Sequence, residues 1–269
     1  MFQRSQQDLV RVFSANRILF LTSIGMFLLS ILFVVGIQMD TRQILGINPW
    51  IKPLKFSTSI FVYALTMIYL LQFHEAKLRE NLSRKIAVTM WLEMIIIAVQ
   101  SARGVQSHFN QSSPGDGVAF AIMGIAILYN TYVMGKITYG FFKSPPMGFS
   151  AVNLRAIRLG LILFMLGCFE GAFMSSRPGH TVGGVDGGPG IPFLNWSTIA
   201  GDLRIAHFLG LHGIQVLLGL CFLSYMLMKN ISESFRNKVM QYILNISFVL
   251  ILLMTVSSFG QALLGKSFF

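Results

Sequence analysis

Long apolar runs recur along this chain and constrain its fold more than any other feature. The run from Ile18 to Ile37 is mostly apolar, and six further stretches of similar character follow it. About 20 apolar residues in a helix are enough to cross a hydrocarbon core of about 30 Å. Each run must be helical, because lipid offers no partner for a bare backbone N–H or C=O group. The sequence therefore predicts an all-α, polytopic membrane protein.

Seven transmembrane helices are predicted, and together they form a single membrane domain over residues 18–264. The expected spans are 18–38, 56–73, 86–109, 117–142, 155–176, 203–228 and 238–264. Residues 1–17 precede this domain as a cytoplasmic segment that we expect to lie on the membrane surface. Charged residues make up 12% of the chain, about half the share in a soluble domain, which supports this class.

Lysine and arginine are distributed unequally between the two sides of the predicted bundle. Fourteen of the 21 basic residues fall on the side of the N-terminus, and the other seven fall on the opposite side. Cytoplasmic loops carry the excess of positive charge. We therefore expect a bacterial cytoplasmic (inner) membrane protein with its N-terminus in the cytoplasm and its C-terminus outside. The net charge of +11 then reflects topology and contact with membrane lipids, not binding of nucleic acid.

Charged and titratable side chains gather in the outer halves of four predicted spans. They are Lys55, Arg103, His108, Glu170, His207 and His212. Such groups are costly in a membrane and usually face the bundle interior. We therefore expect one buried, outward-facing polar pocket in which Glu170 pairs with Arg103 or Lys55. In the span that contains Glu170, glycines at 160, 167 and 171 favour close contact with another helix.

The third span has one polar edge. Glu93, Gln100, Gly104, Ser107 and His108 fall within about 80° of one another at 100° per residue. Most of this edge lies in the outer part of the span, whereas Glu93 lies deeper. Glu93 is either a protonated structural carboxyl or a group that relays protons.

The outer loop 177–202 is rich in glycine, yet it also carries His180, Asp186 and Trp196. Aromatic residues such as Trp196 anchor a loop at the membrane interface. We expect a folded cap over the polar pocket, with His180 and Asp186 as its functional candidates. Asp202 is expected to cap the following helix. The alternative is a plain glycine-rich connection with a solvated histidine.

The histidines suggest a haem or a transition metal as cofactor. His108, His180 and His207 are the candidate metal ligands, and His207 and His212 are the candidate cofactor ligands. His207 and His212 are five residues apart, which differs from the four-residue spacing of zinc-binding helices. In an enzyme of this kind, catalytic roles in positioning substrate or tuning charge would fall to Arg103, Glu170 and Lys55.

Four stretches carry a resemblance that extends from the second span to the sixth: INPWIKPLKF, SARGVQSHFN, GHTVGGVDGGPG and AHFLGLHGIQ. On these motifs the chain resembles a group of bacterial seven-span integral membrane proteins. The resemblance implies the seven-helix membrane fold and carries over no activity.

Three functions remain open at this point. One is a metal- or haem-dependent membrane enzyme or redox protein. Another is a transporter or channel for a small anion or protons, with a small-molecule or ion ligand. The third is a non-catalytic membrane sensor or assembly factor. A polar path through both halves of the membrane would distinguish the transporter, and the sequence shows such a path mainly in the outer half.

Overall fold

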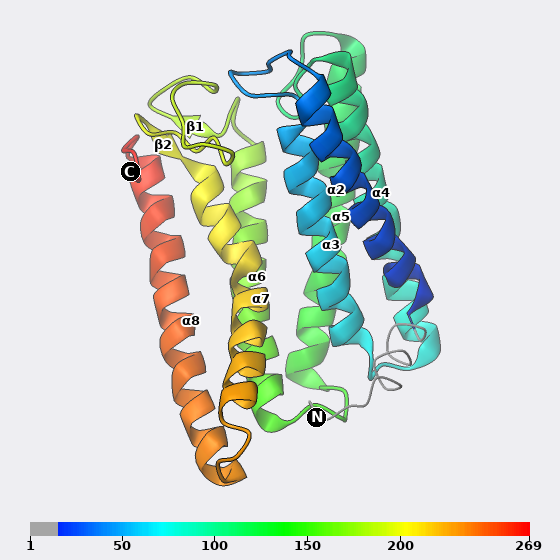
Figure 1. Cartoon of the computed structure of the whole chain (residues 1–269), viewed down its shortest axis with the longest axis vertical. Coiled ribbons are helices and arrows are strands. Elements are labelled where there is room, and N and C mark those ends of the chain that lie inside the picture. The colour runs from blue at the N-terminus through cyan, green and yellow to red at the C-terminus, as the bar shows by residue number, and fades with distance from the viewer. Residues whose placement is uncertain (1–15) are drawn as a thin grey trace. The chain divides into compact units, whose positions relative to one another are not determined.

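The computed structural model describes residues 16–269, so nearly all of the expected interfacial segment 1–17 lies outside the described residues. The described chain is built from helices and two very short strands (Figure 1). They are α2 (Arg17–Met39), α3 (Ile51–Leu71), α4 (Ala76–Arg103), α5 (Pro114–Lys143), α6 (Ala151–Ser175), β1 (Thr181–Val182), β2 (Gly201–Asp202), α7 (Leu203–Leu227) and α8 (Glu233–Leu263). The predicted all-α class is confirmed.

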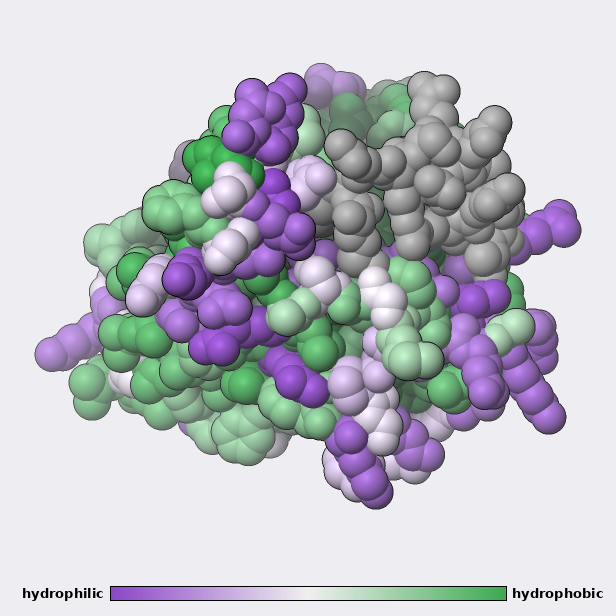
Figure 2. Space-filling view, turned by 90° about the horizontal axis from the view of Figure 1, so that it is seen from below, coloured by the Kyte–Doolittle hydropathy of each residue, from purple (hydrophilic) through white to green (hydrophobic). Residues whose placement is uncertain are grey.

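Six of the helices in residues 16–269 are long and apolar enough to cross a membrane, and α4 is not among them. Many large apolar side chains on these helices are exposed, as expected of surfaces that face lipid. Figure 2 looks onto the end at which α2 begins and α3 ends, and hydrophilic side chains project there beside hydrophobic ones. The protein is therefore a multi-pass membrane protein.

Helix α4 differs from the predicted third span at both ends. It begins ten residues earlier than expected, since its charged first turns are also helical. It ends at Arg103 because Gly104 adopts a left-handed conformation, with φ of 77°, and its N–H donates to the carbonyls of Gln100 and Ser101. The prediction that Ser107 and His108 continue the polar edge of this helix is therefore wrong, because both lie in the loop that follows.

The chain divides into two compact units. Of the described residues, 16–133 and 185–195 form the N-terminal unit, whereas 134–184 and 196–269 form the C-terminal unit. Helix α5 begins in the N-terminal unit and continues into the C-terminal unit after Val133. The glycine-rich loop is likewise divided, because its central segment 185–195 belongs to the N-terminal unit.

In the N-terminal unit, α2 packs along α3, and both contact α4. At one end, Trp50 stacks on Phe33 with ring centroids 5.8 Å apart and donates from Nε1 to Asp40 Oδ2 at 2.9 Å. At the other end, Asn16 Nδ2 donates to Ser83 Oγ at 2.9 Å. These contacts tie the first helix to its neighbours at both of its ends.

In the C-terminal unit, α6 and α7 approach each other through glycines. A Cβ atom on Gly167 would lie 2.6 Å from the backbone nitrogen of Leu211, so no larger residue fits without separating the helices. The expected close contact of this helix is therefore confirmed. Strands β1 and β2 pair antiparallel, with Thr181 opposite Asp202, and close the loop end of this unit.

Candidate functional site in the N-terminal unit

Asp116 is the centre of a hydrogen-bonded cluster near the start of α5. Its residue is only 3% exposed, and its carboxylate accepts from Gln100 Nε2 at 2.9 Å and from Ser113 Oγ at 2.7 Å. Arg103 NH1 lies 2.6 Å from the same carboxylate and also donates to Gln100. The partner of Arg103 is therefore Asp116, where we expected Glu170. Sequence reasoning missed Asp116, because the surrounding SSPGDG stretch resembles an ordinary loop.

Lys55 binds a backbone carbonyl and thereby holds the central segment of the glycine-rich loop. Its Nζ atom donates to the carbonyl oxygen of Leu194 at 3.1 Å. The segment also packs on the turn that precedes α3, since a Cβ on Gly187 would lie 2.9 Å from Leu45 Cβ. Residues 187–195 are thus folded against helix α3 and its preceding turn.

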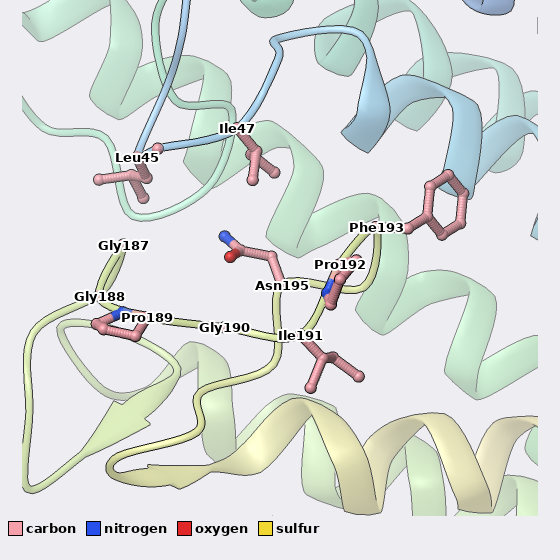
Figure 3. A pocket seen from close by; sticks show the side chains of 11 residues that line it. Leu45, Ile47, Gly187, Gly188, Pro189, Gly190, Ile191, Pro192, Phe193 and Asn195 are labelled. Carbon is pink, nitrogen blue, oxygen red and sulfur yellow. The ribbon is translucent and has the colours of Figure 1, made fainter.

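A cavity of about 420 Å³ lies between that turn and the same segment. Figure 3 shows Leu45 and Ile47 on one side, residues 187–193 on the other, and the side chain of Asn195 between them. Glycines and apolar side chains make up most of the lining. Neither Lys55 nor Arg103 is among the lining residues, so this cavity is not the charged pocket that we expected.

Glu93 lies in the middle of α4 and is buried in the N-terminal unit. Its residue is 2% exposed, and within residues 16–269 neither carboxyl oxygen has a hydrogen-bond partner. Lys52, near the start of α3, attracts it electrostatically. A buried polar group without hydrogen bonds is costly, and an ionised one is more so. Packing alone therefore does not explain the presence of Glu93 in this unit.

A polar cluster shared by three helices lies one helical turn from Glu93, at Thr89 of α4. Thr89 Oγ1 donates to Asn130 Oδ1 at 3.3 Å, and Asn130 Nδ2 donates to Tyr63 Oη at 3.3 Å. These side chains come from α4, α5 and α3, and all three residues are less than 10% exposed. We did not single out Asn130 from the sequence, although an amide in the middle of an apolar run was a usable signal.

Together these groups form a polar column along α4. Its buried polar members on this helix include Ser83, Thr89, Glu93 and Gln100. From Ser83 to Gln100 the helix rises about 26 Å at 1.5 Å per residue. That length is close to the thickness of a hydrocarbon core, about 30 Å. Buried polar side chains thus extend along most of α4, whereas the sequence indicated them mainly toward one end of the bundle.

Each of the candidate histidines makes its own local contacts. His108 lies among the rings of Phe56 and Phe120, with centroids 5.7 and 6.1 Å away. In the C-terminal unit, His207 Nδ1 is 2.7 Å from the carbonyl oxygen of Gly167, and the ring of His212 lies 4.4 Å from that of Phe208.

His180 lies near Asp202, with Nδ1 3.9 Å from a carboxylate oxygen. Asp202 caps α7 as expected, accepting from the backbone N–H groups of Arg204 at 3.0 Å and Ser197 at 2.8 Å. Burial by itself would raise the pKa of Asp202, but the hydrogen bonds and charge of Arg204 outweigh it and hold the pKa below its usual value. Asp202 is therefore an ionised structural group.

Metal binding gains no support from this arrangement. Throughout residues 16–269, no group of three or more His, Cys, Asp or Glu side chains could hold a metal ion. The expected metal-ligand set of His108, His180 and His207 is thus unsupported, and the expected haem at His207 and His212 stays a prediction. Asp186 lies in the segment 185–195 and joins no such group.

Comparison with known proteins adds nothing to this picture. No family model, no curated protein and no solved structure matches the chain. The polar column in the N-terminal unit is the feature from which a function can be inferred.

Proposed function

We propose that the protein is a transporter that moves protons across the membrane through its N-terminal unit, with Glu93 as the group that carries the proton. The observation behind this proposal is the burial of a carboxyl whose two oxygens have no hydrogen-bond partner in the described chain. Ionisable groups inside membrane helices are costly, and they are found along ion pathways and proton relays. A carboxyl in such surroundings is most stable when it holds a proton.

The polar column supplies groups on both sides of Glu93. Toward the loop that precedes α3 lies Lys52, which attracts the carboxylate form. In the other direction the Thr89–Asn130–Tyr63 cluster follows, and the Ser83–Asn16 hydrogen bond lies beyond it. Hydroxyl and amide groups of this kind can order water between them. A proton needs only such a chain of donors and acceptors, and no open pore.

Transport of an anion is favoured less, because the two arginines at the loop end of this unit, Arg42 and Arg103, already have carboxylate partners. Arg42 and Arg103 form ion pairs with Asp40 and Asp116, at 2.7 and 2.6 Å. The amino group of Lys55 is engaged with the carbonyl of Leu194. A solute anion would have to compete with these partners. A metal- or haem-dependent enzyme and a sensor or assembly factor have no specific observation in their favour.

This function requires α4 to cross the membrane as well, so we propose seven spans. Between Lys85 and Gln100, Glu93 is the one ionisable residue in the sequence. We also propose, from the distribution of basic residues, that the protein lies in the inner membrane of a bacterium with its N-terminus in the cytoplasm. Membership of the bacterial seven-span group likewise stays a prediction.

Proton flux into liposomes tests the function directly. Protein would be reconstituted with a pH-sensitive dye inside and a potassium diffusion potential across the membrane. Wild-type protein should acidify the lumen well above empty liposomes, and Glu93→Gln should reduce the flux at least tenfold. The matched control is Glu80→Gln, because Glu80 is an exposed glutamate on the same helix that pairs with Arg84 at 2.8 Å.

Two results would overturn the proposal. One is wild-type flux no greater than that of empty liposomes, and the other is Glu93→Gln flux equal to that of the wild type. Circular dichroism and thermal unfolding of each variant in detergent establish that it is folded before its flux is compared. Glu93→Asp, which keeps the carboxyl, should retain part of the flux.

A further inference from the structure

The C-terminal unit contains a second buried carboxyl, Glu170 of α6. The residue is 2% exposed, and its Oε2 atom is buried with no hydrogen-bond partner in the chain from residue 16 onward. Thr255 of α8 is in the same condition, since it is 0% exposed and its Oγ1 atom has no partner in that range. Two unsatisfied polar groups in one helical core are unusual and need a cause.

Glu170 and Thr255 lie at the same level of this unit. The rings of Phe173 and Phe259 contact each other edge to face, with centroids 5.4 Å apart. Helices α6 and α8 run in the same direction (Figure 1). Glu170 precedes Phe173 by three residues, and Thr255 precedes Phe259 by four, so each lies about one turn from the ring contact.

His207 of α7 lies against the same part of α6. A Cβ on Gly171, the residue after Glu170, would be 2.5 Å from its Cε1 atom. Its Nδ1 atom is 2.7 Å from the carbonyl oxygen of Gly167. A carbonyl only accepts, so Nδ1 carries the hydrogen, and in a neutral ring Nε2 is then an acceptor.

From this geometry we propose that Glu170, Thr255 and His207 form a proton-binding site in the C-terminal unit. The protonated carboxyl of Glu170 is the donor, Nε2 of His207 is the acceptor, and a water held by the hydroxyl of Thr255 connects them, because no direct hydrogen bond joins these side chains. When the proton moves, the O–H bond of Glu170 breaks and an N–H bond forms on His207, with the water passing one proton on as it receives another. A carboxylate and an imidazolium result, and the total charge of the site is unchanged.

The surroundings contain few other charges that would compete for this proton. On α7, His212 is the next titratable residue, and at the start of that helix Asp202 is paired with Arg204 at 2.6 Å and lies near His180. On α6 the neighbouring titratable residue is Cys168, and α8 carries none between Tyr242 and Lys266. The site is independent of Glu93, which belongs to the other unit.

Infrared difference spectroscopy of the full chain in lipid tests this site. Spectra at high and low pH should contain the C=O band of a protonated carboxyl that Glu170→Gln removes. The same band should shift in His207→Gln and in Thr255→Val, because each variant removes a side chain that binds the water next to the carboxyl. Glu233→Gln, an exposed glutamate on α8, should leave it unchanged.

Labelling the histidine ring nitrogens gives a second readout that does not depend on folding of a Glu170 variant. In wild-type protein, the nitrogen resonances of His207 should report a hydrogen on Nδ1 and an acceptor at Nε2. Gly171→Ala should displace the ring and shift both the resonances and the carboxyl band. If Glu170→Gln removes no protonated-carboxyl band, or if the band that it removes is insensitive to both His207→Gln and Thr255→Val, the proposal is overturned.

Discussion

Asp116 and Glu93 lie in the same unit and are equally buried, at 3% and 2% exposed, yet their surroundings are opposite. Asp116 accepts from Gln100, Arg103 and Ser113, whereas both oxygens of Glu93 are without partners among the described residues. The partners of Asp116 stabilise a carboxylate at the end of the helices. The surroundings of Glu93 destabilise a carboxylate in the middle of α4. Burial alone therefore does not distinguish a structural carboxyl from a functional one, but the partners of the carboxyl do.

The C-terminal unit repeats this contrast with its own residues. Asp202 is 2% exposed and is held by Ser197 and Arg204. Glu170 is equally buried and has an unsatisfied oxygen in the described chain. Each unit thus has a satisfied carboxylate near the loops and an unsatisfied carboxyl within its helices.

The largest effect on stability is expected from Asp202→Ala. This change removes the cap of α7 and the ion pair between Asp202 and the partly buried Arg204. Breaking a buried ion pair and losing a cap should together lower the free energy of unfolding by about 3 kcal/mol. Thermal or denaturant unfolding in detergent measures it. The control is Glu80→Ala, which removes an exposed ion pair. If Asp202→Ala lowers the free energy of unfolding by less than Glu80→Ala does, Asp202 is not the structural group described.

A smaller loss is expected from Asp116→Ala. Gln100 would lose a buried acceptor, but Arg103 is half-exposed and can turn to water. We therefore expect a loss of about 2 kcal/mol. The same unfolding assay checks it, and the proton flux of the folded variant should stay near the wild-type value. A complete loss of proton flux in a folded Asp116→Ala protein would show that Asp116 has a functional role as well as a structural one.

Glu93→Leu should change stability in the opposite direction. Replacing an unsatisfied buried carboxyl by an apolar side chain of similar size removes a desolvation cost of about 1 kcal/mol. The variant should therefore unfold at a higher temperature than wild-type protein while losing its proton flux. A destabilised Glu93→Leu protein would show that the carboxyl has structural partners in the membrane.

The pH dependence of stability should report on the satisfied carboxylates. The pKa of Asp202 is lowered in the folded protein, and Arg42 holds the pKa of Asp40 well below its usual range. A lowered pKa means that the stabilisation is present above the pKa of the unfolded chain and disappears as the pH falls through the folded one. Unfolding temperature should therefore drop as the pH falls below about 4. Asp202→Asn should flatten this drop, whereas Glu93→Gln should leave it unaltered.

The sequence by itself determined the helical membrane class, the cap at Asp202 and the close helix contact in α6. These features depend on residues near each other in the chain. Apolar length, a capping side chain and glycine spacing act locally, and lipid leaves the backbone no alternative to a helix. Burial of Glu93 and Gln100 on one face of α4 also followed from helical periodicity.

Only the tertiary structure decided which polar groups meet. Asn130 forms hydrogen bonds with Thr89, which is 41 positions away in the sequence, and with Tyr63, which is 67 positions away. Asn16 and Ser83, which also form a hydrogen bond, are 67 positions apart. No periodic pattern specifies such partners, because they depend on how helices rotate and slide against one another. The same holds for Arg103, which pairs with Asp116 because Gly104 ends α4 and the loop then returns to the start of α5. Whether a buried carboxyl is satisfied is therefore a property of the packed helices, not of any one of them.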